Sequence, residues 1–104
     1  VTSDQEEAYK GVEVVYAKSW GSLADYGDTS AEAMRRAKLR DWRVTEQRMS
    51  RGQFAIFMHC LPVRRNVVVD DAVLDGPRSV VLDEAENRLH AQKAILEHLA
   101  RENS

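Results

Sequence analysis

Compact runs of β-branched and aromatic residues alternate along the chain with amphipathic, helix-like segments. Two of these runs, Val12–Tyr16 and Gln53–Met58, have the composition of buried strands. A third and shorter run, Ser79–Leu82, predicts one more strand. Because strands that alternate with helices are typical of βαβ units, the pattern predicts a parallel sheet.

Helix-start patterns precede the first two helical segments. Ser3 and Glu6 have the spacing of a capping box, in which each side chain satisfies a backbone N–H of the other residue. The helix that follows is expected to end near Gly11, since glycine readily adopts the left-handed terminating conformation. Thr29 and Glu32 repeat the capping-box spacing ahead of an alanine-rich segment.

The remaining helices are predicted from caps and apolar spacing. Thr45 is expected to be the N-cap of a short helix. In the last helix, acidic residues crowd the first turn, where the helix dipole favours them, and apolar residues form a stripe. After the first, the helices are expected over Asp28–Lys38, Thr45–Ser50, Asp70–Leu74 and Asp83–Arg101.

These elements predict an α/β fold class. The expected architecture is a three-layer, Rossmann-like parallel sheet flanked by helices. Three strands alone make a poor free-standing sheet, because both faces and both edges need cover. We therefore expect an incomplete fold, about half of a domain. The chain begins at Val1 rather than at methionine, from which we expect further residues upstream.

The composition is that of a folded, soluble protein of 104 residues, 43% hydrophobic and 31% charged. A formal net charge of −2 argues against a dedicated nucleic-acid binder. No apolar stretch approaches the ~20 residues that span a bilayer, and no secretory signal is visible. The single cysteine, Cys60, rules out an internal disulfide, and we expect a cytoplasmic location without nucleic-acid or membrane partners.

The densest polar cluster directly follows the second predicted strand. It has the sequence His-Cys-Leu-Pro-Val-Arg-Arg-Asn over residues 59–66. Ligands of open α/β sheets bind beyond the carboxyl ends of the strands, so position alone nominates this loop. Lys18–Trp20 leaves the first predicted strand and Glu84–Arg88 follows the third. Three parallel strands would thus deliver a thiol, several cations and an amide to one edge.

Taken singly, each of these features is more often structural than functional. A lone cysteine is usually a small core residue, and a histidine before a proline turn is usually a structural hydrogen-bonding group. An arginine pair is usually a solvated face and a tryptophan usually packs. The basic interval 35–51 is similarly expected to be a solvated helix rather than a phosphate-binding surface.

The sequence contains no pattern that indicates a metal or nucleotide site. His59, Cys60, His90 and His98 lack the spacing of zinc ligands. There is no glycine-rich phosphate loop of either common kind. We therefore expect no metal and no cofactor.

Two linked motifs resemble the aspartate/ornithine transcarbamylase family. His59–Pro62 is similar to its His-Cys-Leu-Pro motif, typical of the ornithine branch, and Glu84–Arg88 with His90–Lys93 resembles its C-terminal signature. Ala17–Gly21 and Leu61–Asn66 are similar to the N-acetylornithine and N-succinylornithine carbamoyltransferases. The resemblance covers essentially the whole chain but only the last third of such an enzyme.

The resemblance implies carbamoyl transfer from carbamoyl phosphate to the terminal amine of an N-acylated ornithine, in arginine biosynthesis. Residues 1–104 would be the C-terminal part of the aspartate/ornithine-binding domain. The N-terminal carbamoyl-phosphate-binding domain, with its Ser-x-Arg-Thr-Arg loop, is absent from the chain. The resemblance further implies a homotrimer for the full-length enzyme, and we expect the isolated chain to be inactive.

Site residues are implied by matching motif positions. Cys60 and the Leu61 carbonyl would hold the reacting amine and the carbamoyl nitrogen. Arg88 would polarise the carbamoyl oxygen, where negative charge develops. Lys18 and Arg64 would bind the α-carboxylate of the acylornithine. His59 and Trp20 complete the substrate-binding set, His59 in a supporting position, and the Leu61–Pro62 bond is implied to be cis.

The sequence leaves alternatives open. The choice between acetyl, succinyl and free ornithine is undecided, in part because Val67–Val69 offer no lysine where some acetylornithine enzymes have one. An ornithine carbamoyltransferase fragment is one alternative. A non-catalytic interaction module that reuses the fold is another. The segment 25–43 matches no family pattern closely.

Overall fold

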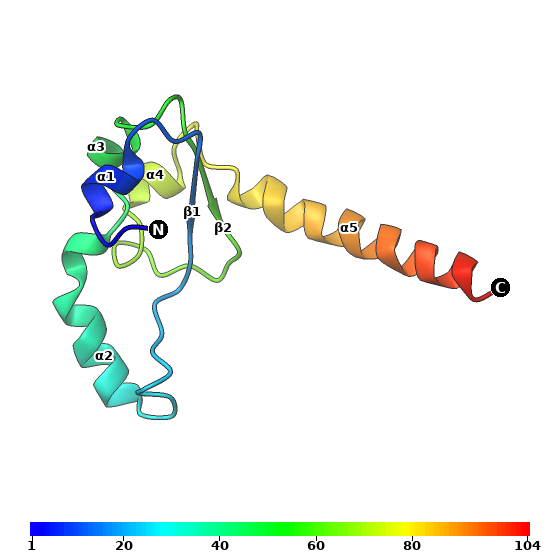
Figure 1. Ribbon diagram of the computed structural model, residues 1–104, viewed down its shortest axis with the longest axis horizontal. Helices are drawn as coiled ribbons and strands as arrows, with labels where there is room; N and C mark the ends of the chain where they lie inside the picture. The colour runs from blue at the N-terminus through cyan, green and yellow to red at the C-terminus, as the bar shows by residue number, and fades with distance from the viewer.

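A computed structural model describes all residues, 1–104. Two short strands lie side by side at the centre of a small body, and three short helices gather beside them (Figure 1). Two further helices leave this body in different directions: α2 forms an arm, and α5 projects away to the C-terminus (Figure 1). The elements in chain order are α1 (Gln5–Tyr9), β1 (Val14–Ala17), α2 (Thr29–Lys38), the 3-10 turn η1 (Arg40–Trp42), α3 (Glu46–Met49), β2 (Ile56–His59), α4 (Asp71–Leu74) and α5 (Val81–Glu102).

The sheet is parallel, as the alternation of strands and helices predicts. β1 pairs with β2 from Val14 opposite Ile56 to Ala17 opposite His59. Both strands therefore end at the same edge, and the 38 residues between them form the crossover connection. The α/β fold class is confirmed, and the sheet is small and partial.

The predicted third strand is wrong. Ser79 makes a single bridge to Phe57, and the chain then enters α5 at Val81. Asp83 and Glu84 lie in the first turn of that helix, where its dipole stabilises carboxylates. The β-branched composition of the segment was outweighed by this acidic first turn, and Val81 reaches the core from a helix instead of a strand.

Aspartates rather than hydroxyl residues cap the first two helices. Asp4 accepts hydrogen bonds from the N–H groups of Glu6 and Glu7, so Ser3 is not the cap. Asp28 caps α2 in the same way, in place of Thr29. Two other predictions about helix ends are confirmed: Thr45 caps α3, and Gly11 follows α1 with a φ of +70°.

The buried core is small and lies between the sheet and the short helices. Phe57 of β2 is fully buried at its centre. Only ten of the 104 residues are buried, so much apolar surface stays exposed. The apolar stripe of α5 belongs to this exposed surface, and Leu96 for example is 66% exposed. No helix combines the length and apolarity needed to cross a bilayer. The core cluster consists of Tyr9, Val44, Phe57, Val69, Val73, Leu74 and Val81.

Candidate active site

Lys18 and Cys60 leave the sheet from neighbouring strand ends. The last paired residues are Ala17 and His59, and Lys18 and Cys60 are the next residue of each strand. Adjacent strands lie about 4.8 Å apart, so the two residues are neighbours at the same edge of the sheet. Cys60 is exposed and free. The arrangement places a thiol and an ammonium group at the carboxyl ends of the strands, where α/β sheets bind ligands.

Glu84 connects the helix α5 to both strand ends. Its Oε1 accepts a hydrogen bond of 2.8 Å from the Tyr16 hydroxyl, and its Oε2 accepts one of 3.1 Å from the His59 backbone N–H. Arg88 follows Glu84 by four residues, one helical turn, and is exposed without an ion pair. Since no third strand forms, Arg88 lies on α5, one turn beyond the contact that Glu84 makes with this edge.

Tyr16 is a member of the site that the sequence reasoning missed. The hydrogen bond to the Glu84 carboxylate raises the pKa of Tyr16 to about 12, and the nearby Cys60 thiol adds a smaller contribution in the same direction. The phenol is thus a hydrogen-bond donor at physiological pH. An aromatic residue near the end of a strand looks like a packing residue, so only its position two residues before Lys18 could have pointed to it.

His59 supports the loop that carries Cys60. Its ring is buried, with 1% exposure, and its Nδ1 accepts a 3.0 Å hydrogen bond from the Leu61 N–H. Burial lowers the pKa of His59, so the ring is neutral and its proton resides on Nε2. The Leu61–Pro62 bond is cis, as implied by the family resemblance. His59 therefore acts on the shape of the loop, and its Nε2 has no partner within this chain.

The two adjacent arginines of the loop have different environments. Arg65 binds Asp75 through two hydrogen bonds and Asp71 through a third. This guanidinium holds the pKa values of both aspartates below their usual range. Arg64 is exposed and makes no ion pair. Of the pair, Arg64 is the one whose charge is free for a ligand.

Trp20 lies away from these groups, beside α2. It lines a small cavity of about 40 Å³ together with residues of that helix, among them Glu32 and Arg36. The structure thus brings Lys18, Cys60 and the Glu84-anchored helix to one edge, with His59 beneath the loop. Trp20 points instead to the arm.

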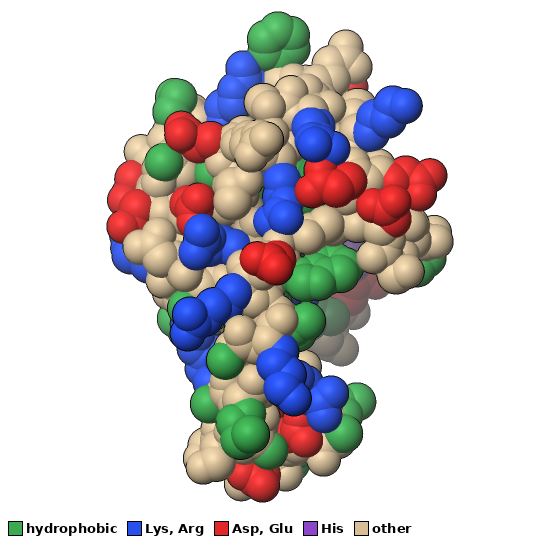
Figure 2. All heavy atoms as spheres, turned by 90° about the vertical axis from the view of Figure 1, so that its left-hand side faces the viewer, with side chains coloured by type: hydrophobic (Ala, Val, Ile, Leu, Met, Phe, Trp, Pro, Cys, Tyr) green, Lys and Arg blue, Asp and Glu red, His purple; other side chains and the backbone are tan.

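The basic interval 35–51 carries its own counter-charges. Figure 2 shows basic and acidic side chains interspersed over this side of the molecule, with no surface of a single sign. Five arginines of the interval lie in ion pairs with carboxylates, which fits the interpretation of a solvated face. The pairs are Arg35 with Asp25, Arg36 with Glu32, Arg43 with Asp70, and Arg48 and Arg51 with Glu6.

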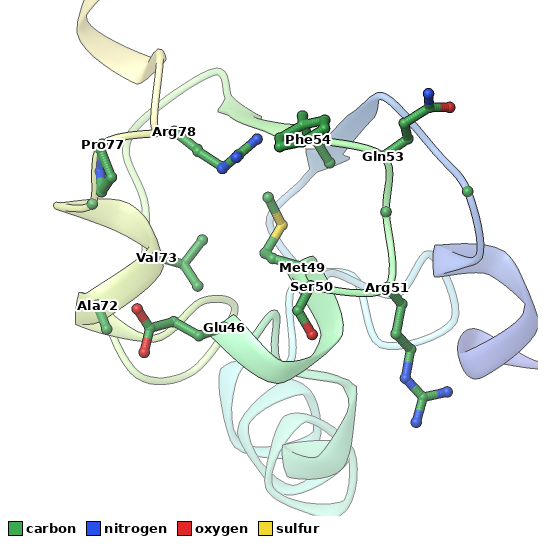
Figure 3. Close-up of a pocket in the computed structure, with 14 residues that line it drawn as sticks. Glu46, Met49, Ser50, Arg51, Gln53, Phe54, Ala72, Val73, Pro77 and Arg78 are labelled. Carbon is green, nitrogen blue, oxygen red and sulfur yellow. The ribbon is translucent and has the colours of Figure 1, made fainter.

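A cavity of about 700 Å³ lies at the opposite end of β2, between α3, α4 and the segment before the strand (Figure 3). Met49 and Val73 form apolar parts of its lining. The Arg78 guanidinium stacks over the Phe54 ring, 4.9 Å from its centroid. This cavity is at the amino end of the strand and is therefore separate from the edge that carries Cys60.

Comparison with known proteins identifies a family model and several relatives that match the chain. Residues 1–99 match the family model described as "Aspartate/ornithine carbamoyltransferase, Asp/Orn binding domain". An N-acetylornithine carbamoyltransferase of Xylella fastidiosa is 48% identical over 100 residues, which is 96% of this chain and 30% of that protein. An ornithine carbamoyltransferase of Halorhodospira halophila is 49% identical over 100 residues, 95% of this chain and 32% of that protein. The chain thus spans about a third of the length of these relatives.

Solved structures agree with these sequence matches. A crystal structure of N-acetyl-L-ornithine transcarbamylase superimposes with a TM-score of 0.82 at 48% identity, over 92% of this chain and 29% of that one. A second, acetylornithine transcarbamylase complexed with acetylcitrulline, gives a TM-score of 0.79 over 89% and 28%. The resemblance of the His-Cys-Leu-Pro and C-terminal motifs is confirmed, and the chain belongs to the aspartate/ornithine carbamoyltransferase family, as part of its Asp/Orn-binding domain.

Proposed function

We propose that this chain is the C-terminal part of the amino-acid-binding domain of a carbamoyltransferase that acts on an N-acylated ornithine in arginine biosynthesis. The observation that carries the proposal is the convergence at one sheet edge. The register of Ala17 with His59 brings Lys18 next to Cys60, and Glu84 fastens the Arg88-bearing helix to the same strand ends. Fold alone does not require this set of side chains.

Two cations bind the α-carboxylate of the substrate in this proposal. Lys18 supplies a point charge, and Arg64 supplies a planar guanidinium that can form paired hydrogen bonds. The ion pairs of Arg65 support this division, because they leave Arg64 as the uncommitted cation of the loop. The terminal amine of the substrate would then extend toward Cys60.

The chemical step joins this amine to the carbamoyl carbon. The deprotonated amine attacks the carbonyl, the C–O bond to phosphate breaks, and phosphate leaves with the electron pair of that bond and takes up the proton that the attacking nitrogen loses. Cys60 and the Leu61 carbonyl orient the reacting nitrogens, and Arg88 stabilises the negative charge that develops on the carbamoyl oxygen. Cys60 forms no covalent intermediate here, since no base is paired with its thiol.

The rest of the site would come from residues outside this chain. We propose that a carbamoyl-phosphate-binding domain supplies the phosphate loop, and that the full-length enzyme is a cytoplasmic homotrimer. The exposed apolar stripe of α5 supports a further domain or subunit, because such surfaces are usually covered by a partner. The solved relatives that bind carbamyl phosphate and N-succinyl-L-norvaline also extend well beyond the matched segment.

Ornithine carbamoyltransferase is the second candidate, favoured by the 49% identity to the Halorhodospira halophila enzyme. The lysine at position 18 distinguishes the two. Plain ornithine enzymes carry a different segment there, according to the family resemblance. Lys18, followed by Ser19 and Trp20, therefore supports the acylated substrate.

A substrate comparison tests the proposal. The complete enzyme, here meaning these residues in their full-length protein or in place of the matching segment of the Xylella fastidiosa relative, is assayed with carbamoyl phosphate. N-acetylornithine, N-succinylornithine and ornithine are compared by kcat/KM. We expect an acylated form to be preferred. A preference for ornithine contradicts the substrate assignment, and the absence of turnover with all three contradicts the proposed reaction.

A further inference from the structure

Glu84 holds α5 to the sheet by both of its carboxylate oxygens. One oxygen accepts from the Tyr16 hydroxyl on β1 at 2.8 Å, and the other accepts from the His59 N–H on β2 at 3.1 Å. Hydrogen bonds to a charged acceptor are about twice as strong as those between neutral groups. A single side chain thus ties the helix to the ends of both strands.

Few other contacts hold this helix in place within the chain. Val81, in its first turn, is buried in the core. Glu84 is half-buried, and every residue of α5 after it is exposed. The direction in which the helix leaves the body therefore depends on these two contacts, three residues apart and both at its first turn (Figure 1).

The residues that Glu84 contacts lie within two residues of the proposed catalytic and binding groups. Tyr16 precedes Lys18 by two residues, and His59 immediately precedes Cys60. Arg88 lies one turn beyond Glu84 on roughly the same side of the helix, because residues four apart are neighbours on a helix surface. A shift of α5 would move Arg88 relative to Lys18 and Cys60.

We propose that Glu84 is a positioning residue for carbamoyl transfer, which fixes Arg88 relative to Lys18 and Cys60. The inference rests on the proposed function, because it assigns Glu84 to the same site. Glu84 does not touch the reacting atoms and acts through the placement of Arg88. The Tyr16 hydroxyl is its partner on β1 and remains protonated at physiological pH, so the contact persists throughout that range.

Replacing Glu84 by alanine and by glutamine distinguishes a loss of Arg88 positioning from a loss of overall stability. In the complete enzyme, Glu84→Ala removes both hydrogen bonds and is expected to lower kcat by roughly 10- to 100-fold, since small displacements of catalytic groups cost factors of this size. Glu84→Gln keeps an oxygen for the His59 N–H and an amide N–H for the Tyr16 oxygen, and should retain most of the activity. Tyr16→Phe removes one contact only and should fall between the two.

A double-mutant cycle with Arg88→Ala provides the decisive readout. If Glu84 acts through Arg88, the loss caused by Glu84→Ala should disappear when Arg88 is already alanine. Equal losses in both backgrounds, or a change in KM at unchanged kcat, would overturn the proposal. Lack of turnover by the unmutated enzyme contradicts the proposed function instead. The positioning claim is then judged by amide exchange across residues 84–90, which Glu84→Ala should accelerate and Glu84→Gln should not.

Discussion

Arg65 and Asp75 share two hydrogen bonds, of 2.6 Å and 2.9 Å, so one of the two neighbouring loop arginines is committed to the fold. The other, Arg64, is exposed and makes no ion pair, so its charge is available to a ligand. A bidentate pair of this kind is geometrically specific, and a third contact to Asp71 reinforces it. Adjacent residues of identical chemistry therefore have separable roles, which mutation can resolve.

Arg64→Ala and Arg65→Ala form a matched pair of variants. Arg64→Ala is expected to raise the KM for the acylornithine by about 10- to 100-fold in the complete enzyme, the usual effect of losing one hydrogen bond to a charged group. Its melting temperature should stay close to that of the unmutated enzyme. Arg65→Ala should lower the melting temperature instead, because Asp71 and Asp75 lose their partner. The opposite assignment of the two effects would show that the loop presents Arg65 to the substrate.

Lys18→Ala should weaken acylornithine binding and leave the affinity for carbamoyl phosphate nearly unchanged. The reason is that Lys18 is assigned to the α-carboxylate and not to the carbamoyl group. Titration with each ligand separately, by calorimetry, measures the two affinities. Lys10→Ala serves as control, since Lys10 is exposed at the end of α1, outside the candidate site. Equal weakening of both ligands would contradict the role of Lys18.

Arg88→Ala should reduce kcat by about 100-fold or more, the effect expected when a donor to a developing oxyanion is lost. Steady-state kinetics with both substrates varied measures kcat and KM separately. Arg101→Ala provides the control, since Arg101 lies more than three turns further along the same helix. A loss confined to the KM for acylornithine would place Arg88 in ground-state binding instead.

The Tyr16 hydroxyl should contribute a pH-dependent part of the stability. Its pKa is about 12 in the folded protein against about 10 in an unfolded chain, so the folded state holds its proton more tightly. The contribution is therefore complete below about pH 10 and is lost as the pH rises from there through 12. The free energy of unfolding of the unmutated enzyme and of Tyr16→Phe should converge over this window. A constant difference between the two would contradict the hydrogen bond to Glu84.

The 104-residue chain alone should show no carbamoyl transfer, because the proposed phosphate loop lies outside it. It should also self-associate through the exposed stripe of α5, where Leu89, Ile95 and Leu96 are each more than half exposed. A carbamoylation assay and analytical ultracentrifugation test the two expectations. Leu96→Lys should reduce the association. Turnover by the isolated chain would refute the assignment of the missing loop.

The two observed strands, the family motifs and most helices were predictable because each depends on local composition. Val12–Tyr16 and Gln53–Met58 overlap the observed strands, each of which ends one residue later than predicted, and Thr45 caps its helix as expected. The predicted caps Ser3 and Thr29 failed because Asp4 and Asp28 stand next to them, and a carboxylate competes well for the same N–H groups.

The candidate site was harder to predict from the sequence than the fold. The motif positions of Cys60 and Lys18 were visible in the sequence, and the strand register brings them together. The link from Tyr16 to Glu84 joins residues 68 positions apart, and no local pattern indicates such a contact. The third strand was predicted from β-branched composition alone, although the acidic residues that start α5 begin only two residues after Val81.

Residues 21–42, part of the crossover between the strands, can vary without disturbing the strand ends that carry the candidate site. None of the residues of α2 is buried, and the arm that it forms leaves the body and returns (Figure 1). Lys18 and Cys60 are held together by the hydrogen-bonded ladder between Val14–Ala17 and Ile56–His59, not by the intervening segment. Insertions, deletions or grafted loops within residues 21–42 should thus leave the paired strand ends, and with them Lys18 and Cys60, in place. Residues 21–42 are therefore the segment in which natural variation and engineered insertions should be tolerated best.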